Sequence, residues 1–180
     1  MGGERSCGSC SLCCKLLAIE GVEERPGWTW CRHCRPGKGG CSIYDQRPQA
    51  CRSFVCGWLS GGLDPVLDPE RWRPTQARMM LTAETVEQQV QIVIHVDPNF
   101  PDRWREPPYH DDIKHLACAI PASQQLFVRI KYRLVEITEA GEREHGEVPM
   151  AGWTDQRSLR LAESFDRTGD AYTRKPQAAK

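Results

Sequence analysis

Apolar and polar residues alternate along two stretches in the second half of the chain. Residues 86–96 carry apolar side chains at every second position from Val90 to Val96, which predicts a half-buried strand that ends at the Asp-Pro-Asn sequence of 97–99. Residues 126–138 repeat the pattern from Leu126 to Leu134 and predict a second long strand. Each of these strands is expected to have one face in the core.

A helix is predicted between the two strands. Apolar residues recur at helical spacing over 109–120, two aspartates stand near its start, and Pro121 ends it. Residues 139–142 predict a turn that closes a hairpin onto a short strand at 143–148. We therefore expect an α+β fold with a small antiparallel sheet and one or two helices.

The first sixty residues show neither the alternation of a strand nor the apolar spacing of a helix. Glycine and proline recur throughout them. A Ser-Gly-Gly-Leu-Asp-Pro sequence at 60–65 reads as a turn or linker. The chain thus divides into an N-terminal cysteine-rich segment (1–60), a small α+β region (61–166) and a flexible tail (167–180). Because the first segment has few aliphatic residues, we expect bound metal rather than an apolar core to hold it together.

Composition narrows the class of protein. The 180 residues include 24 basic and 24 acidic side chains, a balance that argues against nucleic acid as a partner. No apolar run is long enough to cross a bilayer, and charged residues near the start replace the apolar region of a secretory signal. We expect a cytoplasmic protein without membrane contact. A protein partner stays open.

The number and clustering of the cysteines are unusual for a chain of this composition. Nine of the ten cysteines fall within the first 56 residues. Two Cys-x2-Cys pairs overlap in the first motif, a third pair follows, and single cysteines come after it. Such spacing brings sulfurs close enough to share a metal ion or cluster. The candidate ligands are Cys7, Cys10, Cys13, Cys14, Cys31, Cys34, Cys41, Cys51 and Cys56.

Disulfides and unliganded thiols are the alternatives. An odd number of cysteines and the lack of an export signal argue against a disulfide scaffold. A structural metal also contributes more, about 10–16 kcal/mol against roughly 2–4 kcal/mol for each bridge. Up to about residue 59, the chain has eight basic and five acidic residues. The excess positive charge favours the thiolate form of the cysteines.

Adjacent Cys13 and Cys14 bear on the number of centres. Neighbouring side chains leave the backbone in different directions, so we expect these two to serve two centres or to bridge them. Eight sulfurs fill two four-sulfur sites and leave one spare, and His33 is a candidate nitrogen ligand. Sulfur ligation suits zinc and iron–sulfur clusters alike, so the spacing does not decide between these cofactors.

The cysteine motifs resemble those of the YkgJ-type cysteine-cluster family. They consist of CxxCxxCCK at 7–15, WCxHC at 30–34, GCSIY at 40–44 and RPxxCRxFxCxWL at 47–59. Members are described as zinc- or iron-chelating domains with a CxxCxxCC signature. The resemblance implies chelation by Cys7, Cys10, Cys13, Cys14, Cys41 and Cys51. It extends to Cys31, Cys34 and Cys56 through a narrower subgroup.

Several functions remain open on this resemblance. The leading hypothesis is a metal-binding protein, with a redox or metal accessory role. Some members resemble the domain of flagellin lysine N-methylases that is associated with an iron–sulfur cluster, so an iron–sulfur oxidoreductase or a protein-modifying enzyme is the alternative. This chain has no Gly-x-Gly-x-x-Gly loop after a strand. An interaction module with purely structural zinc is the third hypothesis.

Other residues carry weaker hypotheses. Arg47 and Arg52 flank Cys51, and we expect them to donate hydrogen bonds to metal-bound sulfur rather than only to hold the loop. Cys118 lies beside the apolar stripe of the predicted helix, which favours a buried, inert thiol. His95, His110 and His115, with the aspartates at 111–112, form a weaker candidate for a hydrolytic metal site.

Overall fold

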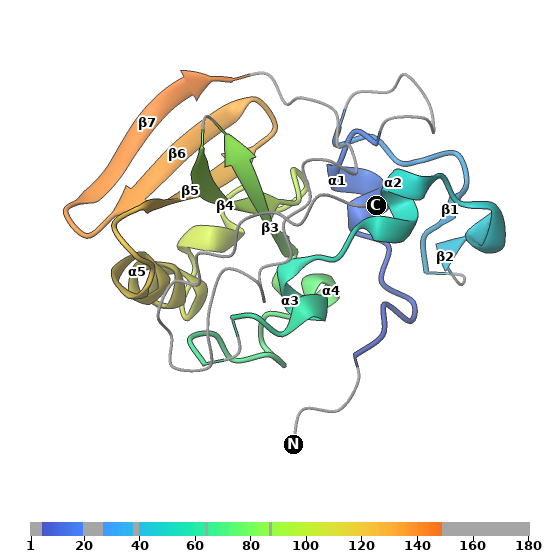
Figure 1. The fold of residues 1–180 in the computed structure, drawn as a ribbon, viewed down its shortest axis with the longest axis horizontal. Coiled ribbons are helices and arrows are strands. Elements are labelled where there is room, and N and C mark those ends of the chain that lie inside the picture. Colours follow the sequence, from blue (N-terminus) through green and yellow to red (C-terminus); the bar gives the residue numbers. More distant parts are fainter. Residues whose placement is uncertain (1–4, 20–26, 38–39, 64, 87, 149–180) are drawn as a thin grey trace.

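The structure is a computed structural model that describes residues 5–19, 27–37, 40–63, 65–86 and 88–148. A five-stranded sheet forms its centre, and the cysteine-rich segment lies beside that sheet (Figure 1). The predicted tail at 167–180 falls outside the described residues. None of the described helices is long and apolar enough to cross a membrane.

The strands of the large sheet follow one another in chain order. They are β3 (Met79–Val86), β4 (Gln89–Val96), β5 (Gln124–Ile130), β6 (Arg133–Thr138) and β7 (Gly141–Glu147). All neighbours are antiparallel except β4 and β5, which run parallel. A crossover through η2 (Arg103–Arg105) and α5 (Tyr109–Ala119) joins that parallel pair. The predicted α+β class is confirmed, with a large sheet that is mixed rather than antiparallel throughout.

The second predicted strand is in fact a hairpin. Residues 126–138 divide into β5 and β6, with a two-residue turn at Lys131 and Tyr132. Lys131 adopts a positive φ of 53° and thereby reverses the chain. Tyr132 was expected on the apolar face, but at the turn it is 46% exposed. Alternation alone does not reveal a turn whose two residues keep the phase of the pattern.

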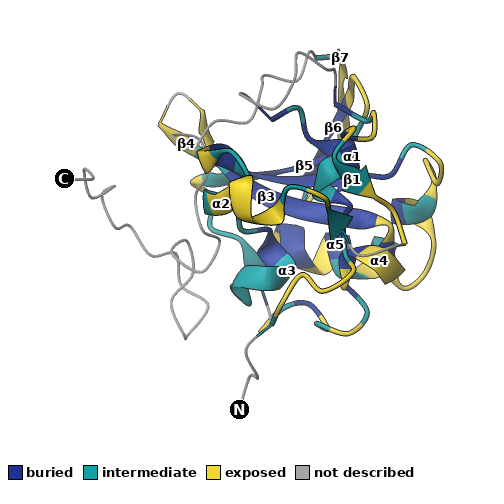
Figure 2. Cartoon of the chain, turned by 90° about the vertical axis from the view of Figure 1, so that its right-hand side faces the viewer, coloured by how far each residue is buried: buried dark blue, intermediate teal, exposed yellow. Residues whose placement is uncertain are grey.

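Strand β3 has no counterpart in the predicted elements because both of its faces are buried. Met79, Leu81 and Ala83 belong to the main core, whereas Met80 and Thr82 are buried on the opposite face. A strand covered on both sides loses the alternation that identifies a strand with one buried face. Figure 2 shows the buried strands in dark blue, with β7 exposed at the edge of the sheet.

The main core lies between the sheet and α5. Ile113 and Leu116 of α5 pack with the sheet residues Ile94 and Val128, and Trp104 of η2 is fully buried among them. The helix therefore presents the predicted apolar stripe to the sheet. Its N-terminal side carries the aspartates, and Asp112 accepts hydrogen bonds from Arg71 and Trp72.

Short elements make up the cysteine-rich segment and its connection to the sheet. They are α1 (Cys13–Leu16), β1 (Cys34–Arg35), β2 (Gly40–Cys41), η1 (Tyr44–Gln46), α2 (Gln49–Ser53), α3 (Gly57–Ser60) and α4 (Pro74–Ala77). β1 and β2 pair as a small antiparallel sheet, and α3 and α4 both contact β3.

The cysteine-rich segment has an apolar core of its own. Leu12, Leu16, Leu17 and Ile19 are buried and pack with Met80 of β3. This corrects the expectation that metal replaces apolar packing there. The four aliphatic residues are close together in the sequence. The low average aliphatic content of the sixty residues therefore does not reveal them. The segment is attached to the sheet by hydrophobic contact.

A buried ion pair provides a second attachment. The Nζ atom of Lys15 in α1 lies 2.5 Å from Oδ1 of Asp97, which directly follows β4, and their side chains are 7% and 4% exposed. The same carboxylate oxygen accepts a hydrogen bond from the backbone N–H of Asn99. Lys15 also lies over the ring of Trp30, with Nζ 5.6 Å from the ring centroid.

We expect Asp97→Asn to destabilise the protein because it leaves a buried ammonium without its counter-charge. Breaking one side of a buried pair typically lowers the free energy of unfolding by about 3–5 kcal/mol. Chemical denaturation followed by tryptophan fluorescence measures this loss. Asp102→Asn, at an exposed position nearby, is the matched control, and equal stability of the two variants would show that the ion pair contributes nothing.

His95 is buried on the face of the sheet opposite α5. Its Nε2 atom lies 3.0 Å from the Thr82 hydroxyl, and its register partner on β5 is Arg129. Burial, with a further contribution from the Arg129 charge, lowers the pKa of His95 to about 3. The imidazole is therefore neutral in the folded protein at physiological pH.

This lowered pKa predicts a pH-dependent loss of stability. The unfolded chain binds a proton at His95 near pH 6.5, whereas the folded chain stays neutral until about pH 3. Below pH 6.5 the unfolded state holds more protons, so stability falls by about 1.4 kcal/mol per pH unit from this residue. Denaturation of wild type and His95→Gln between pH 6 and pH 4 tests this. The stability difference between them must shift in favour of the variant as the pH falls, and a constant difference would contradict the assignment.

Candidate metal centre

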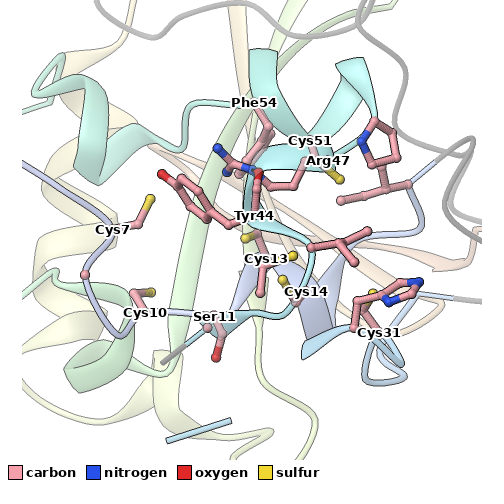
Figure 3. A pocket seen from close by; sticks show the side chains of 17 residues that line it. Cys7, Cys10, Ser11, Cys13, Cys14, Cys31, Tyr44, Arg47, Cys51 and Phe54 are labelled. Atoms are coloured by element: carbon pink, nitrogen blue, oxygen red, sulfur yellow. Dashed lines mark hydrogen bonds between the residues drawn. The ribbon is translucent and has the colours of Figure 1, made fainter. Parts of the chain in front are cut away.

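A cavity of about 150 Å³ opens in the cysteine-rich segment. Its lining includes His33, Tyr44, Arg47 and Phe54, together with seven of the nine candidate cysteines. Those seven are Cys7, Cys10, Cys13, Cys14, Cys31, Cys41 and Cys51. Figure 3 shows Cys7 and Cys10 on one side of the cavity, Cys31 and Cys51 on the other, and Cys13 and Cys14 between them.

Backbone turns bring together the members of two Cys-x2-Cys pairs, those at 7–10 and 31–34. The N–H of Cys10 donates to the carbonyl of Cys7 at 2.8 Å, and the N–H of Cys34 donates to the carbonyl of Cys31 at 2.9 Å. Gly8 follows Cys7 with a φ of +50°, a conformation that glycine adopts without strain. The spacing thus closes one turn around each pair of sulfurs.

Further backbone contacts join the separate cysteine motifs. The N–H of Cys31 donates to the carbonyl of Cys14 at 2.9 Å, which fixes the second motif against the first. Cys34 of β1 and Cys41 of β2 are direct register partners. Cys51 lies in α2, which begins after Pro48, and the N–H of Cys51 donates to the Pro48 carbonyl at 3.0 Å.

One group of sulfurs consists of Cys7, Cys10, Cys13 and Cys56. Burial is the main cause that raises the pKa of Cys56 to about 11, and the Cys7 and Cys10 thiols contribute to the same shift. The pKa of Cys10 is likewise raised by burial first and then by Cys7, and Cys14, which lies outside this group, also raises the pKa of both Cys10 and Cys7. Cys56 does not line the cavity but belongs to the apolar core of the segment, against which Cys10, Cys13 and Cys51 also pack.

The other five cysteines form a second group around Cys14. Burial raises the pKa of Cys51 to about 11, and Cys14, Cys31 and Cys41 add to the shift in that order. The pKa of Cys34 also reaches about 11, through burial and then through Cys14 and Cys31, while a hydrogen bond with Ser11 opposes the shift. We call these sets the Cys10 group and the Cys51 group.

Cys13 and Cys14 stand where the two groups meet. Their side chains hydrogen bond with each other, and this bond, followed by burial, raises the pKa of Cys13 well above its ordinary value. The remaining thiol influences on Cys13 come from Cys56 and Cys10. The two adjacent thiols of α1 thus contact each other, and Cys14 influences thiols of both groups.

All ten cysteines are free thiols. Within the described parts of the chain, no group of three or more His, Cys, Asp or Glu side chains is arranged so that it could hold a metal ion. The sulfurs surround a cavity and do not converge on one point.

Arg47 and Arg52 differ in what they contact. Arg52 is exposed and donates from Nε to the carbonyl of Arg47 at 2.7 Å, so it holds the loop. Arg47 lines the cavity, and its charge lowers the pKa of Cys7 and of Cys51 against the larger effect of burial. Of the two arginines, only Arg47 therefore lines the cavity and acts on its thiols, and it does so through its charge.

The other candidate sites do not assemble. His95 is buried within the sheet, His115 is exposed on α5, and His110 lies 3.7 Å from Glu142. Asp112 is occupied by Arg71 and Trp72. No hydrolytic centre forms from these residues.

Cys118 corrects a second expectation, because its thiol is exposed. It lies on the solvent side of α5, one position beyond Leu116 and Ala117, which are the buried members of the stripe. Sequence reasoning also missed Ser11, which is buried inside the first motif and contacts Cys34, and Phe54, which lines the cavity. Both residues stand between the cysteines of their motifs, and Phe54 is also one of the specified positions of the motif at 47–59.

Comparison with known proteins does not add a family to this geometry. No family model, no curated protein and no solved structure matches the chain.

We predict that thiol labelling of the metal-free protein separates the cysteines by environment. With a pKa of about 11, roughly 0.1% of the Cys56 thiol is ionised at pH 8, so iodoacetamide reacts slowly there. The exposed Cys118 is the internal control and should be labelled first. Mass spectrometry of proteolytic peptides measures both rates, and labelling of Cys56 as fast as Cys118 would contradict the buried position.

Proposed function

We propose that the cysteine-rich segment binds a metal–sulfur centre and that this is the function of the cavity. The observation that carries the proposal is the gathering of seven free cysteines from four separate motifs around one cavity. The described residues that line it include neither aspartate nor glutamate. A sulfur-rich donor set of this kind selects zinc or iron–sulfur clusters rather than calcium or magnesium.

The size of the cavity favours a cluster over a single ion. About 10–15 Å³ is enough to hold one water molecule, and this cavity measures about 150 Å³. A polynuclear iron–sulfur centre occupies such a volume better than one zinc ion does. Zinc remains the second candidate, because a closed four-cysteine zinc site is purely structural and the segment needs a structural centre as well.

The nine candidate cysteines supply enough sulfur for two four-sulfur centres. The Cys10 group has four members, as a four-sulfur site requires, and the Cys51 group has five, which leaves one cysteine spare. Cys13 and Cys14 then serve one centre each. The resemblance to the YkgJ-type family agrees with metal chelation at these positions, and thiolate ligation suits a reducing cytoplasm.

Purification without air, followed by metal and sulfide analysis, tests the proposal. An iron–sulfur centre requires iron and acid-labile sulfide together with broad visible absorption, whereas structural zinc leaves the protein colourless. Protein that contains neither metal after expression in metal-replete medium, and that takes up neither on reconstitution, would end the proposal.

We predict that substitution of one candidate ligand removes the metal of its own sulfur group and leaves the metal of the other group bound. Cys10→Ser and Cys51→Ser each eliminate one centre, so each variant should retain about half of the wild-type metal, and the double variant should retain almost none. Cys118→Ser is the matched control because it exchanges an exposed thiol far from the cavity. Complete loss of metal in either single variant would favour one shared centre instead of two.

A further inference from the structure

Arg47 is the only permanently charged residue among the described residues that line the cavity. Cysteines from both groups share this lining with apolar side chains such as Ile43 and Phe54. The nearest carboxylate in sequence, Asp45, is exposed and does not line the cavity.

The guanidinium of Arg47 is held in place from two directions. Its Cζ atom lies 3.6 Å from the centroid of the Tyr44 ring, and its Nε donates to the Tyr44 carbonyl at 2.8 Å. Arg52 fixes the backbone of the same residue through its bond to the Arg47 carbonyl, 2.7 Å from Nε. A stacked and hydrogen-bonded arginine loses little further entropy when it faces an anion.

The charge of Arg47 acts on both sulfur groups. Arg47 shares the cavity lining with Cys7, which belongs to the Cys10 group, and with Cys51 of the other group. Figure 3 shows the Arg47 side chain at the cavity between these two cysteines. One cation is therefore within electrostatic range of both sets of candidate ligands.

We propose that Arg47 compensates the negative charge of the metal–sulfur centres and thereby determines how tightly they are held and at what potential they are reduced. The inference rests on the proposed function. Four thiolates overcompensate a divalent ion, and reduction of an iron–sulfur cluster adds another negative charge. A fixed neighbouring cation stabilises each of these anionic states.

Arg47→Gln removes the charge, and Arg35→Gln is the matched control. Arg35 is an exposed arginine on β1 in the same segment, and it does not line the cavity. Chelator competition measures metal retention, and a spectroelectrochemical titration measures the reduction potential of an iron-loaded sample. We expect Arg47→Gln to release metal about tenfold more readily. We also expect a tenfold weaker preference for the reduced state, which is 59 mV toward lower potential for a one-electron couple.

Two further measurements separate charge from loop structure. Arg47→Lys keeps the charge but loses the planar stacking, so it should recover most of the retention and the potential. The difference between wild type and Arg47→Gln should shrink in 1 M salt, where electrostatic interactions are screened within about 3 Å. A merely structural role for Arg47 predicts neither result.

The outcomes distinguish this inference from the proposed function. If metal-loaded Arg47→Gln has the same metal retention and the same reduction potential as Arg35→Gln, the proposed role of Arg47 is wrong. The proposed metal centre is not affected by that result. An Arg47→Lys variant as defective as Arg47→Gln would also overturn it. Failure of the wild-type protein to bind zinc or iron removes the proposed function and this inference with it.

Discussion

Many thiols are buried in a small volume, and the cost of ionising them there is the constraint on which the N-terminal segment depends. Cys34, Cys51 and Cys56 all reach a pKa of about 11, with burial as the largest cause and neighbouring thiols as an added one. Such a site stays protonated and neutral without a cation. A bound metal reverses the balance, because it stabilises the thiolate form of every ligand at once.

The rest of the structure gives this site a fixed base. Apolar contacts around Leu16 and Met80 hold the cysteine-rich segment on the sheet, and the pair of Lys15 and Asp97 fixes its orientation. Short turns then place the sulfurs, since backbone hydrogen bonds close the Cys-x2-Cys turns at 7–10 and 31–34. The segment thus has an apolar core next to the sheet and a cysteine-lined cavity on top of that core. Helix α1 contributes residues to both.

Much of the fold can be predicted from local pattern, and the site only in part. Helix 109–120 and the strand that ends at Val96 follow from spacing, because apolar side chains recur at the helical period in the first and at every second position in the second. The strand is in fact buried on both faces near its end, since Val93 and His95 are buried as well as Ile92 and Ile94. Strand β3 escapes prediction because both of its faces are covered. Cysteine spacing predicts which residues are candidate ligands. The division into two groups depends on the directions of individual side chains, and the separate roles of Arg47 and Arg52 depend on one loop.

The position of Lys15 immediately after Cys14 has a consequence for how the two halves of the molecule communicate. The backbone that carries a candidate ligand also carries the ammonium that is bound to Asp97, 82 residues further along the chain. A rotation of α1 that adjusts the Cys14 sulfur must also move this buried contact at the end of β4. One short helix therefore links the Cys14 sulfur to the residue that follows β4.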